Sequence, residues 1–119
     1  MKYCWTTIMV TDLERSIAFY RDIVGLPVNR RFSAGPGSEI VFLGDGETEV
    51  ELIKRIGPAS SVGNAISLGF AVESLDDAMT FVKEHGIEIE SGPFQPNDHI
   101  KFFYVLDPDG VRVQFSQSF

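Results

Sequence analysis

The chain has 119 residues, 44% of them hydrophobic, and a formal net charge of −7, which predicts one globular domain with a buried core. Its 17 acidic residues outnumber 10 basic ones, and without a basic cluster they argue against nucleic-acid binding. The single cysteine, Cys4, rules out an internal disulfide and fits a reducing compartment. Without a signal-peptide pattern or a membrane-length apolar run, we expect a cytoplasmic protein that binds no membrane.

The first half of the chain predicts a strand, a helix and three more strands. Alternating residues predict a strand over residues 3–10. Thr11 and Glu14 form a capping-box pattern at the start of a helix, which apolar residues at helical spacing continue as far as Gly25. Turn residues then separate three strands expected over residues 27–33, 39–43 and 48–55.

The second half predicts the same order of elements after a linker. Residues 56–64 are rich in Gly, Pro and Ser without a hydrophobic period, which is typical of a linker. Residues 65–73 alternate as a strand, and Ser74 caps a helix that ends at Gly86. Strands are expected over residues 87–94 and 100–106 with a turn at 95–98, and Asp107-Pro108-Asp109-Gly110 predicts a tight turn before the last strand.

The two halves therefore form an internal repeat. Three positions of the first helix match three of the second at an offset of 62 (75 − 13): Leu13, Ser16 and Phe19 against Leu75, Ala78 and Phe81. Because caps and turn glycines recur in the same order, chance alignment is a poor explanation. We predict a single α+β domain over residues 1–119, with βαβββ repeats at 1–55 and 65–119.

In several predicted strands one face is purely apolar and needs a helix to cover it, so the other face is open or lines a cavity. That second face collects aromatic, polar and charged residues: Trp5, Thr7, Met9, Glu49, Glu51, Ser67, Arg112 and Gln114. Such a mixture is typical of a ligand site. A solvated sheet face would also be polar, but Trp5 and Met9 argue against that alternative. Cys4 is expected on the helix-covered side.

Three stretches of the sequence carry a family resemblance: residues 10–26, Val50-Glu51-Leu52, and residues 103–110. They resemble the vicinal oxygen chelate superfamily, which includes glyoxalase I, bleomycin resistance proteins, fosfomycin-modifying enzymes and extradiol dioxygenases. The resemblance covers essentially the whole chain. It implies a cupped mixed β-sheet with the helices on its outer face, and a twofold homodimer. It also implies that Phe102 and Tyr104 line the cup while Phe103 and Val105 pack under a helix.

Metal-dependent members of this superfamily hold a divalent cation with four inward residues. The resemblance places Trp5, Glu51, Ser67 and Gln114 at those positions. Only Glu51 keeps the usual ligand type, because Trp5 has no lone pair to offer, Ser67 is a poor ligand and the Gln114 amide is a weak one. Neither His85 nor His99 stands at a motif position; we expect a helix-end charge and an exposed loop residue, respectively. We therefore expect no metal and no other cofactor.

Two of these residues keep alternative interpretations. Glu51 is either a general base or anchor for a cationic group, tuned by burial beside Trp5, or a carboxylate paired with Arg112 or Arg55. Trp5 is either a stacking platform for a flat ligand or a plug in a cavity that has lost its role.

The sequence predicts a metal-free small-molecule binding protein of the glyoxalase/bleomycin-resistance type, with an organic, aromatic or cationic ligand in the cup. The expected ligand contacts are Trp5, Thr7, Met9, Glu51, Ser67, Phe102, Tyr104, Arg112 and Gln114. The alternative is a divergent glyoxalase-like lyase or isomerase with Glu51 as general base or residual metal ligand. A third interpretation is a dimeric scaffold whose pocket has decayed.

Overall fold

The chain folds into two compact units, Met1–Ser60 and Ser61–Phe119, in a computed structural model that describes residues 1–57, 63 and 65–119. Each unit contains one strand, one helix and three further strands, which confirms the α+β class and the repeated βαβββ order. Most of the predicted linker, residues 58–62 and 64, lies outside the described residues. The single-domain assignment stays a prediction. Within the described residues, no helix is long and apolar enough to cross a membrane.

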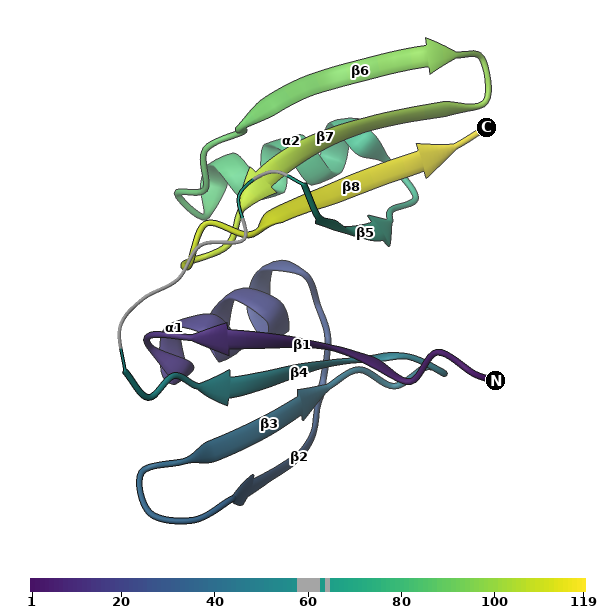
Figure 1. Cartoon of the computed structure of the whole chain (residues 1–119). Helices are drawn as coiled ribbons and strands as arrows, with labels where there is room; N and C mark the ends of the chain where they lie inside the picture. Colours follow the sequence, from purple (N-terminus) through teal and green to yellow (C-terminus); the bar gives the residue numbers. More distant parts are fainter. Residues whose placement is uncertain (58–62, 64) are drawn as a thin grey trace. The chain divides into compact units, whose positions relative to one another are not determined.

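The first unit forms a four-stranded mixed sheet with one helical segment (Figure 1). Its elements are β1 (Trp5–Val10), α1 (Leu13–Ala18), the π-helical turn η1 (Phe19–Ile23), β2 (Val28–Ser33), β3 (Glu39–Leu43) and β4 (Glu49–Lys54). The strand order is β1-β4-β3-β2, with β1 and β4 parallel and the other pairs antiparallel.

The second unit repeats this topology. Its elements are β5 (Ser67–Ala71), α2 (Leu75–Glu84), β6 (Ser91–Asn97), β7 (Ile100–Leu106) and β8 (Arg112–Ser118). The order is β5-β8-β7-β6, and Figure 1 shows β8, drawn in yellow, between β5 and β7. The first and last strands of each repeat are therefore parallel neighbours in both sheets.

One face of each sheet is buried beneath its own helix. In the first unit α1 packs against β4, and the buried apolar residues include Ile8, Val10, Val50, Leu52, Leu13 and Ile17. In the second unit α2 packs against β8, and they include Phe103, Val105, Val113, Phe115, Leu75 and Val82. Removal of these side chains from water drives the folding of each unit. The burial of Phe103 and Val105 agrees with the orientation expected for β7.

The two helix starts differ in how well the sequence predicted them. Ser74 is the N-cap of α2, and its Oγ accepts a hydrogen bond from the Asp77 amide at 3.2 Å, as expected. The expected cap at Thr11 is wrong: Asp12 is the N-cap of α1, and its Oδ1 accepts from the Arg15 amide at 3.2 Å. The adjacent carboxylate explains the shift, since an Asp oxygen accepts amide hydrogen bonds at least as well as a Thr hydroxyl. Glu14 pairs with Arg31.

The sixth strand was predicted too early. Ile87 still belongs to the helix end, because its amide donates to Val82 O at 2.9 Å. The strand starts at Ser91 and runs through Asn97, so the predicted turn at 95–98 is wrong and the turn lies at residues 98–99. Gly92 has a φ of +99°, and a Cβ there would lie 3.0 Å from Phe103 Cα, so the close approach to β7 needs glycine. Prolines are tolerated because β6 is an edge strand.

The tight turn before β8 is confirmed. The Asp107 carboxylate is buried, and its Oδ1 accepts from the amides of Asp109 at 2.8 Å and Val111 at 2.9 Å. The Gly110 amide donates to Asp107 O at 3.0 Å, and Gly110 has a φ of +84°. This turn sets the register in which β8 presents Arg112 and Gln114 on the face away from α2.

Candidate functional site

In the first unit, β1 presents Trp5, Thr7 and Met9 on the face away from α1, and all three are exposed. Thr7 stands directly opposite Glu51 on β4. The Thr7 hydroxyl donates a hydrogen bond of 2.5 Å to Glu51 Oε1. Glu51 is only 9% exposed. A carboxylate so far removed from water needs hydrogen-bond donors around it, and Thr7 supplies one.

An aromatic cluster surrounds Phe42, which lies opposite Glu51 on β3. The Trp5 ring meets the Phe42 ring edge-on, at 5.2 Å and 80°. Phe32 stacks with Phe42 at 6.3 Å, and the Arg30 guanidinium lies over the Phe42 ring, 3.9 Å from its centroid. Trp5 remains 44% exposed. A flat or cationic group can therefore reach an aromatic surface here.

Sequence reasoning missed Arg30, Phe32 and Phe42. β3 is a continuous apolar run in which alternation does not distinguish the two faces, and β2 is exposed throughout. Only the register with β4, which places Phe42 beside Glu51, identifies the side on which these residues lie.

The other carboxylate of this face, Glu49, is held by neighbouring side chains. The Asn29 amide donates to Glu49 Oε2 at 2.7 Å, and Arg30 forms an ion pair with Glu49 Oε1 at 3.7 Å. Arg55, one proposed partner of Glu51, donates to the Met9 carbonyl at 3.3 Å. Glu49 is therefore tied to the sheet by Asn29 and Arg30, whereas Glu51 is held by Thr7.

In the second unit, Gly69, Gln114 and Tyr104 form one row across three strands of the sheet. Gln114 Nε2 donates a hydrogen bond to Tyr104 Oη at 3.0 Å. Ser67 is exposed and stands opposite Arg112 on β8. The side chains of Tyr104, Arg112 and Gln114 are half-buried. These predicted contacts thus lie on one face of the second sheet.

Arg112 joins a second set of contacts on this face. Its guanidinium lies 3.8 Å from the Tyr104 ring centroid. It also forms an ion pair of 3.2 Å with Glu90 and donates to Ser91 Oγ at 3.3 Å. The Ser91 hydroxyl and then Arg112 lower the pKa of Glu90 below its ordinary value, because both favour the charged carboxylate. Arg112, a proposed partner of Glu51, is thus paired with Glu90 inside its own unit.

Three aromatic rings meet beside Arg112. Phe102 lies 5.8 Å from Tyr104 in an edge contact, and Phe94 lies 5.7 Å from Phe102. Phe94 is 44% exposed. Sequence reasoning missed Phe94 because β6 was placed four residues too early and its register was unknown.

The four positions that the family resemblance equates with metal ligands carry poor donors in this chain, apart from Glu51. Trp5 packs its ring edge-on with Phe42, and Gln114 donates through its nitrogen to Tyr104. Ser67 is an exposed hydroxyl. Among the described residues, no group of three or more His, Cys, Asp and Glu side chains is arranged to hold an ion. Because divalent cations need several converging nitrogen, sulfur or carboxylate donors, this donor set does not suit one.

The remaining reactive side chains lie elsewhere. His85 is the C-cap of α2, and its Nδ1 lies 2.8 Å from Phe81 O. His99 is exposed in the turn between β6 and β7. Cys4 was expected on the helix-covered side, and this is wrong: it is exposed ahead of β1, because the strand starts only at Trp5.

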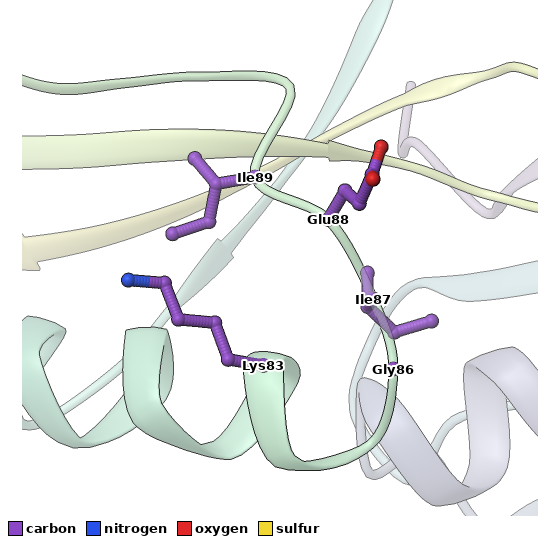
Figure 2. A pocket seen from close by; sticks show the side chains of 5 residues that line it. All are labelled: Lys83, Gly86, Ile87, Glu88 and Ile89. Carbon is purple, nitrogen blue, oxygen red and sulfur yellow. The ribbon is translucent and has the colours of Figure 1, made fainter.

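A separate pocket of about 510 Å³ lies in the second unit, at the end of α2. It is lined by Lys83, Gly86, Ile87, Glu88 and Ile89. Figure 2 shows Lys83 extending from the last turn of α2 toward Ile89, while the Glu88 carboxylate points away from the Lys83 ammonium. None of the predicted contacts lines this pocket, so it is distinct from the candidate site on the sheets.

The βαβββ topology, repeated in both units, points to one class of protein. The chain belongs to the Glyoxalase/Bleomycin resistance protein/Dioxygenase superfamily, whose family model matches residues 2–115. The assignment agrees with the resemblance carried by the sequence motifs.

Known proteins are similar to the chain over nearly its whole length. The chain is 32% identical to a lactoylglutathione lyase of Salmonella typhimurium over an alignment of 128 positions, gaps included. This alignment covers 99% of the chain and 93% of the relative. Among solved structures, glyoxalase I of Leishmania major is 26% identical with a TM-score of 0.82, covering 97% of this chain and 85% of that one. TnmS3, an antibiotic-binding protein from a Streptomyces species, shares the fold at 18% identity, with a TM-score of 0.80 and coverages of 100% and 97%.

Proposed function

We propose that this chain is a metal-free small-molecule binding protein of the glyoxalase/bleomycin-resistance type. The observation that carries the proposal is the chemistry at the four metal positions of the family. Trp5, Ser67 and Gln114 replace good donors, and Gln114 turns its amide nitrogen toward Tyr104. Only Glu51 keeps a usual ligand type, and one carboxylate alone does not hold a catalytic cation.

The ligand we propose is an organic molecule with an aromatic or cationic part. Trp5 offers an exposed ring, packed edge-on against the buried Phe42 next to Glu51, and Arg30 rests on Phe42 as a cation does on an aromatic face. In the second unit, Phe94, Phe102 and Tyr104 offer a further aromatic surface. We propose Thr7, Met9, Ser67, Arg112 and Gln114 as the remaining contacts.

Trp5 gives a direct test, because it is the only tryptophan in the chain. Titration with aromatic and cationic compounds should quench its fluorescence saturably for at least one class, with a matching rise in Tm. Titration with Ni²⁺, Zn²⁺ or Mn²⁺ serves as the second arm and should give no stoichiometric binding. Tight metal binding would overturn the proposal. The absence of any saturable ligand would also overturn it, and would favour a dimeric scaffold whose pocket has decayed.

The second candidate is a divergent glyoxalase-like lyase or isomerase in which Glu51 acts as proton base. The 32% identity to a lactoylglutathione lyase favours it, as does the burial of Glu51 at 9% exposure. Glu51→Gln should abolish turnover of a glyoxalase-type substrate in this case, and only weaken ligand binding about tenfold in the first. Glu49→Gln, on the same strand face, is the matched control and should leave turnover unchanged.

We further propose a cytoplasmic homodimer that binds neither nucleic acid nor membranes. Family membership supports the dimer, because members of the family usually form twofold dimers, and the single cysteine agrees with a reducing compartment. The net charge of −7 disfavours contact with phosphate backbones. Sedimentation equilibrium should give twice the chain mass, and a monomer at all concentrations would contradict the dimer.

A further inference from the structure

Gln114 and Tyr104 form a fixed hydrogen-bonded pair on the face of the second sheet that points away from α2. They stand directly opposite each other on β8 and β7, and Gln114 Nε2 donates to Tyr104 Oη at 3.0 Å. This bond leaves Gln114 Oε1 as an acceptor. The phenol oxygen, having accepted, keeps its own proton to donate. The pair therefore presents one acceptor and one donor side by side.

Gly69 leaves the acceptor of this pair accessible. It stands opposite Gln114 on β5, and a Cβ at this position would lie 3.4 Å from Gln114 Oε1. Gly69 is not among the glycines with positive φ, so the backbone does not require glycine there. Since glycine also weakens a strand interior, its presence opposite Gln114 fits a place where another group approaches closely.

The donor of the pair is held in place by its neighbours. The Arg112 guanidinium stacks on the Tyr104 ring at 3.8 Å and is itself fixed by Glu90 and Ser91. The Phe102 ring makes an edge contact with Tyr104. Because the tyrosine is already ordered, little conformational entropy is lost when a ligand binds to its hydroxyl.

An aromatic surface lies next to the pair. In the adjacent row of the sheet, Phe102 stands opposite Phe94, and Phe94 is 44% exposed. A planar ring resting on Phe94 and Phe102 would bring its edge to the neighbouring row, where Gln114 and Tyr104 lie.

From these contacts we propose that the Gln114–Tyr104 pair binds the lactam or imide edge of a planar ligand, its N–H donating to Gln114 Oε1 and its carbonyl accepting from the Tyr104 hydroxyl. The proposal names the ligand class for the proposed binding function and rests on that function. A carboxylate ligand fits the pair poorly, because it brings two acceptors and no donor to face the Gln114 oxygen.

The bicyclic lactam carbostyril and its N-methyl derivative test this inference, because they differ only in the group on the nitrogen, a hydrogen that can be donated or a methyl that cannot. Isothermal titration of the whole chain should give binding about five- to tenfold tighter for carbostyril. Gly69→Ala, which places a methyl against the Gln114 acceptor, should bring the two affinities close together. Tyr104→Phe, which removes the donor to the carbonyl that both lactams carry, should weaken the binding of both. Ser116 lies on the same face of the sheet, one row away from the pair, so Ser116→Ala is the matched control. This variant should still bind carbostyril more tightly than the N-methyl derivative.

Three outcomes overturn the inference in distinguishable ways. Equal affinity for the two lactams, unchanged in Tyr104→Phe, would reject the lactam edge while leaving a flat-ligand binding protein standing. If neither lactam binds while the Trp5 screen finds other ligands, the ligand class is wrong and the binding function survives. If no compound binds in either experiment, both proposals fail.

Discussion

Thr7 faces Glu51 across β1 and β4 in the first repeat, and Gly69 faces Gln114 at the matching place across β5 and β8. The offsets are 62 (69 − 7) and 63 (114 − 51), so the two pairs occupy equivalent positions in one repeated topology. In the first pair the hydroxyl already binds the carboxylate. In the second the glycine leaves the amide oxygen open. The same backbone therefore gives one internally bonded position and one that is available to a ligand.

The comparison extends to the cations. Arg30 lies over Phe42 in the first unit and Arg112 over Tyr104 in the second, each paired with a glutamate. In both sheets an arginine therefore orders an aromatic ring on the face away from the helix. The ring bears a hydroxyl only in the second unit, so only there can it donate a hydrogen bond.

The largest expected effect is the loss of stability when a buried side chain is removed beneath either helix. It tests whether the helix-covered faces of the two sheets contribute equally to stability. Leu52→Ala and Phe115→Ala remove buried side chains at matching positions of β4 and β8. Each should lower the free energy of unfolding by about 3 kcal/mol, because a cavity replaces packed atoms. Urea denaturation measures both. Met9→Ala, on the exposed face of β1, is the control and should change it by less than about 0.5 kcal/mol; a similar loss there would contradict the assignment of the faces.

The next largest effect distinguishes the turn before β8 from the equivalent turn before β4. Asp107→Ala should cost about 1–2 kcal/mol, because the buried amide of Val111 loses the acceptor it has at 2.9 Å. Asp45→Ala, in the exposed turn before β4, should be nearly neutral. Thermal unfolding followed by circular dichroism measures the two variants. Equal losses of stability in the two variants would show that the two turns are held in the same way. That result would contradict the hydrogen bonds by which Asp107 holds the turn before β8.

The helix caps are expected to be equivalent. Asp12 and Ser74 stand 62 residues apart (74 − 12), and each accepts an amide hydrogen bond at 3.2 Å. Replacing either with alanine should cost about 1 kcal/mol, measured by urea denaturation. Thr11→Ala is the control for the first helix and should cost clearly less than Asp12→Ala if Asp12 is the cap.

The smallest effect is a pH dependence from Glu90. Its pKa is lowered in the folded chain below the ordinary 4.5, so the unfolded state binds the proton more readily. Its stabilising contribution is therefore present above pH 4.5 and is lost as the pH falls through the folded pKa. Unfolding measured from pH 6 to pH 3 should be less pH-dependent for Glu90→Gln than for the unaltered chain. An unchanged slope would contradict the lowered pKa of Glu90, and with it the hydrogen bond from Ser91 and the ion pair with Arg112.

Alternation and turn residues were enough to predict most of the fold. The strands at Trp5, Glu39 and Ile100, the cap at Ser74 and the closing turn follow from local patterns that tertiary packing reinforces. The sixth strand could not be located, because Pro93 and Pro96 are unfavourable in most strands and only its edge position tolerates them.

The candidate site was predicted less completely. Residues on alternating strands, such as Glu51 and Gln114, were assigned to the correct face from sequence alone. Phe42 and Arg30 were not, because a continuous apolar run has no preferred face until its strand partner is known. The hydrogen bond between Gln114 and Tyr104 likewise depends on a register that no single strand reveals.

The π-helical turn η1 explains how the helical segments of the two repeats can differ in length. The helix starts lie 62 residues apart (75 − 13), whereas the glycines that follow the helices lie 61 apart (86 − 25), so the first helical segment holds one more residue than the second. Val24 N bonds to Phe19 O, five residues back, at 3.1 Å, and this wider turn accommodates the extra residue within the helix. Insertions in this helix can thus be absorbed locally, and the strand register that sets the site is preserved while the repeats diverge.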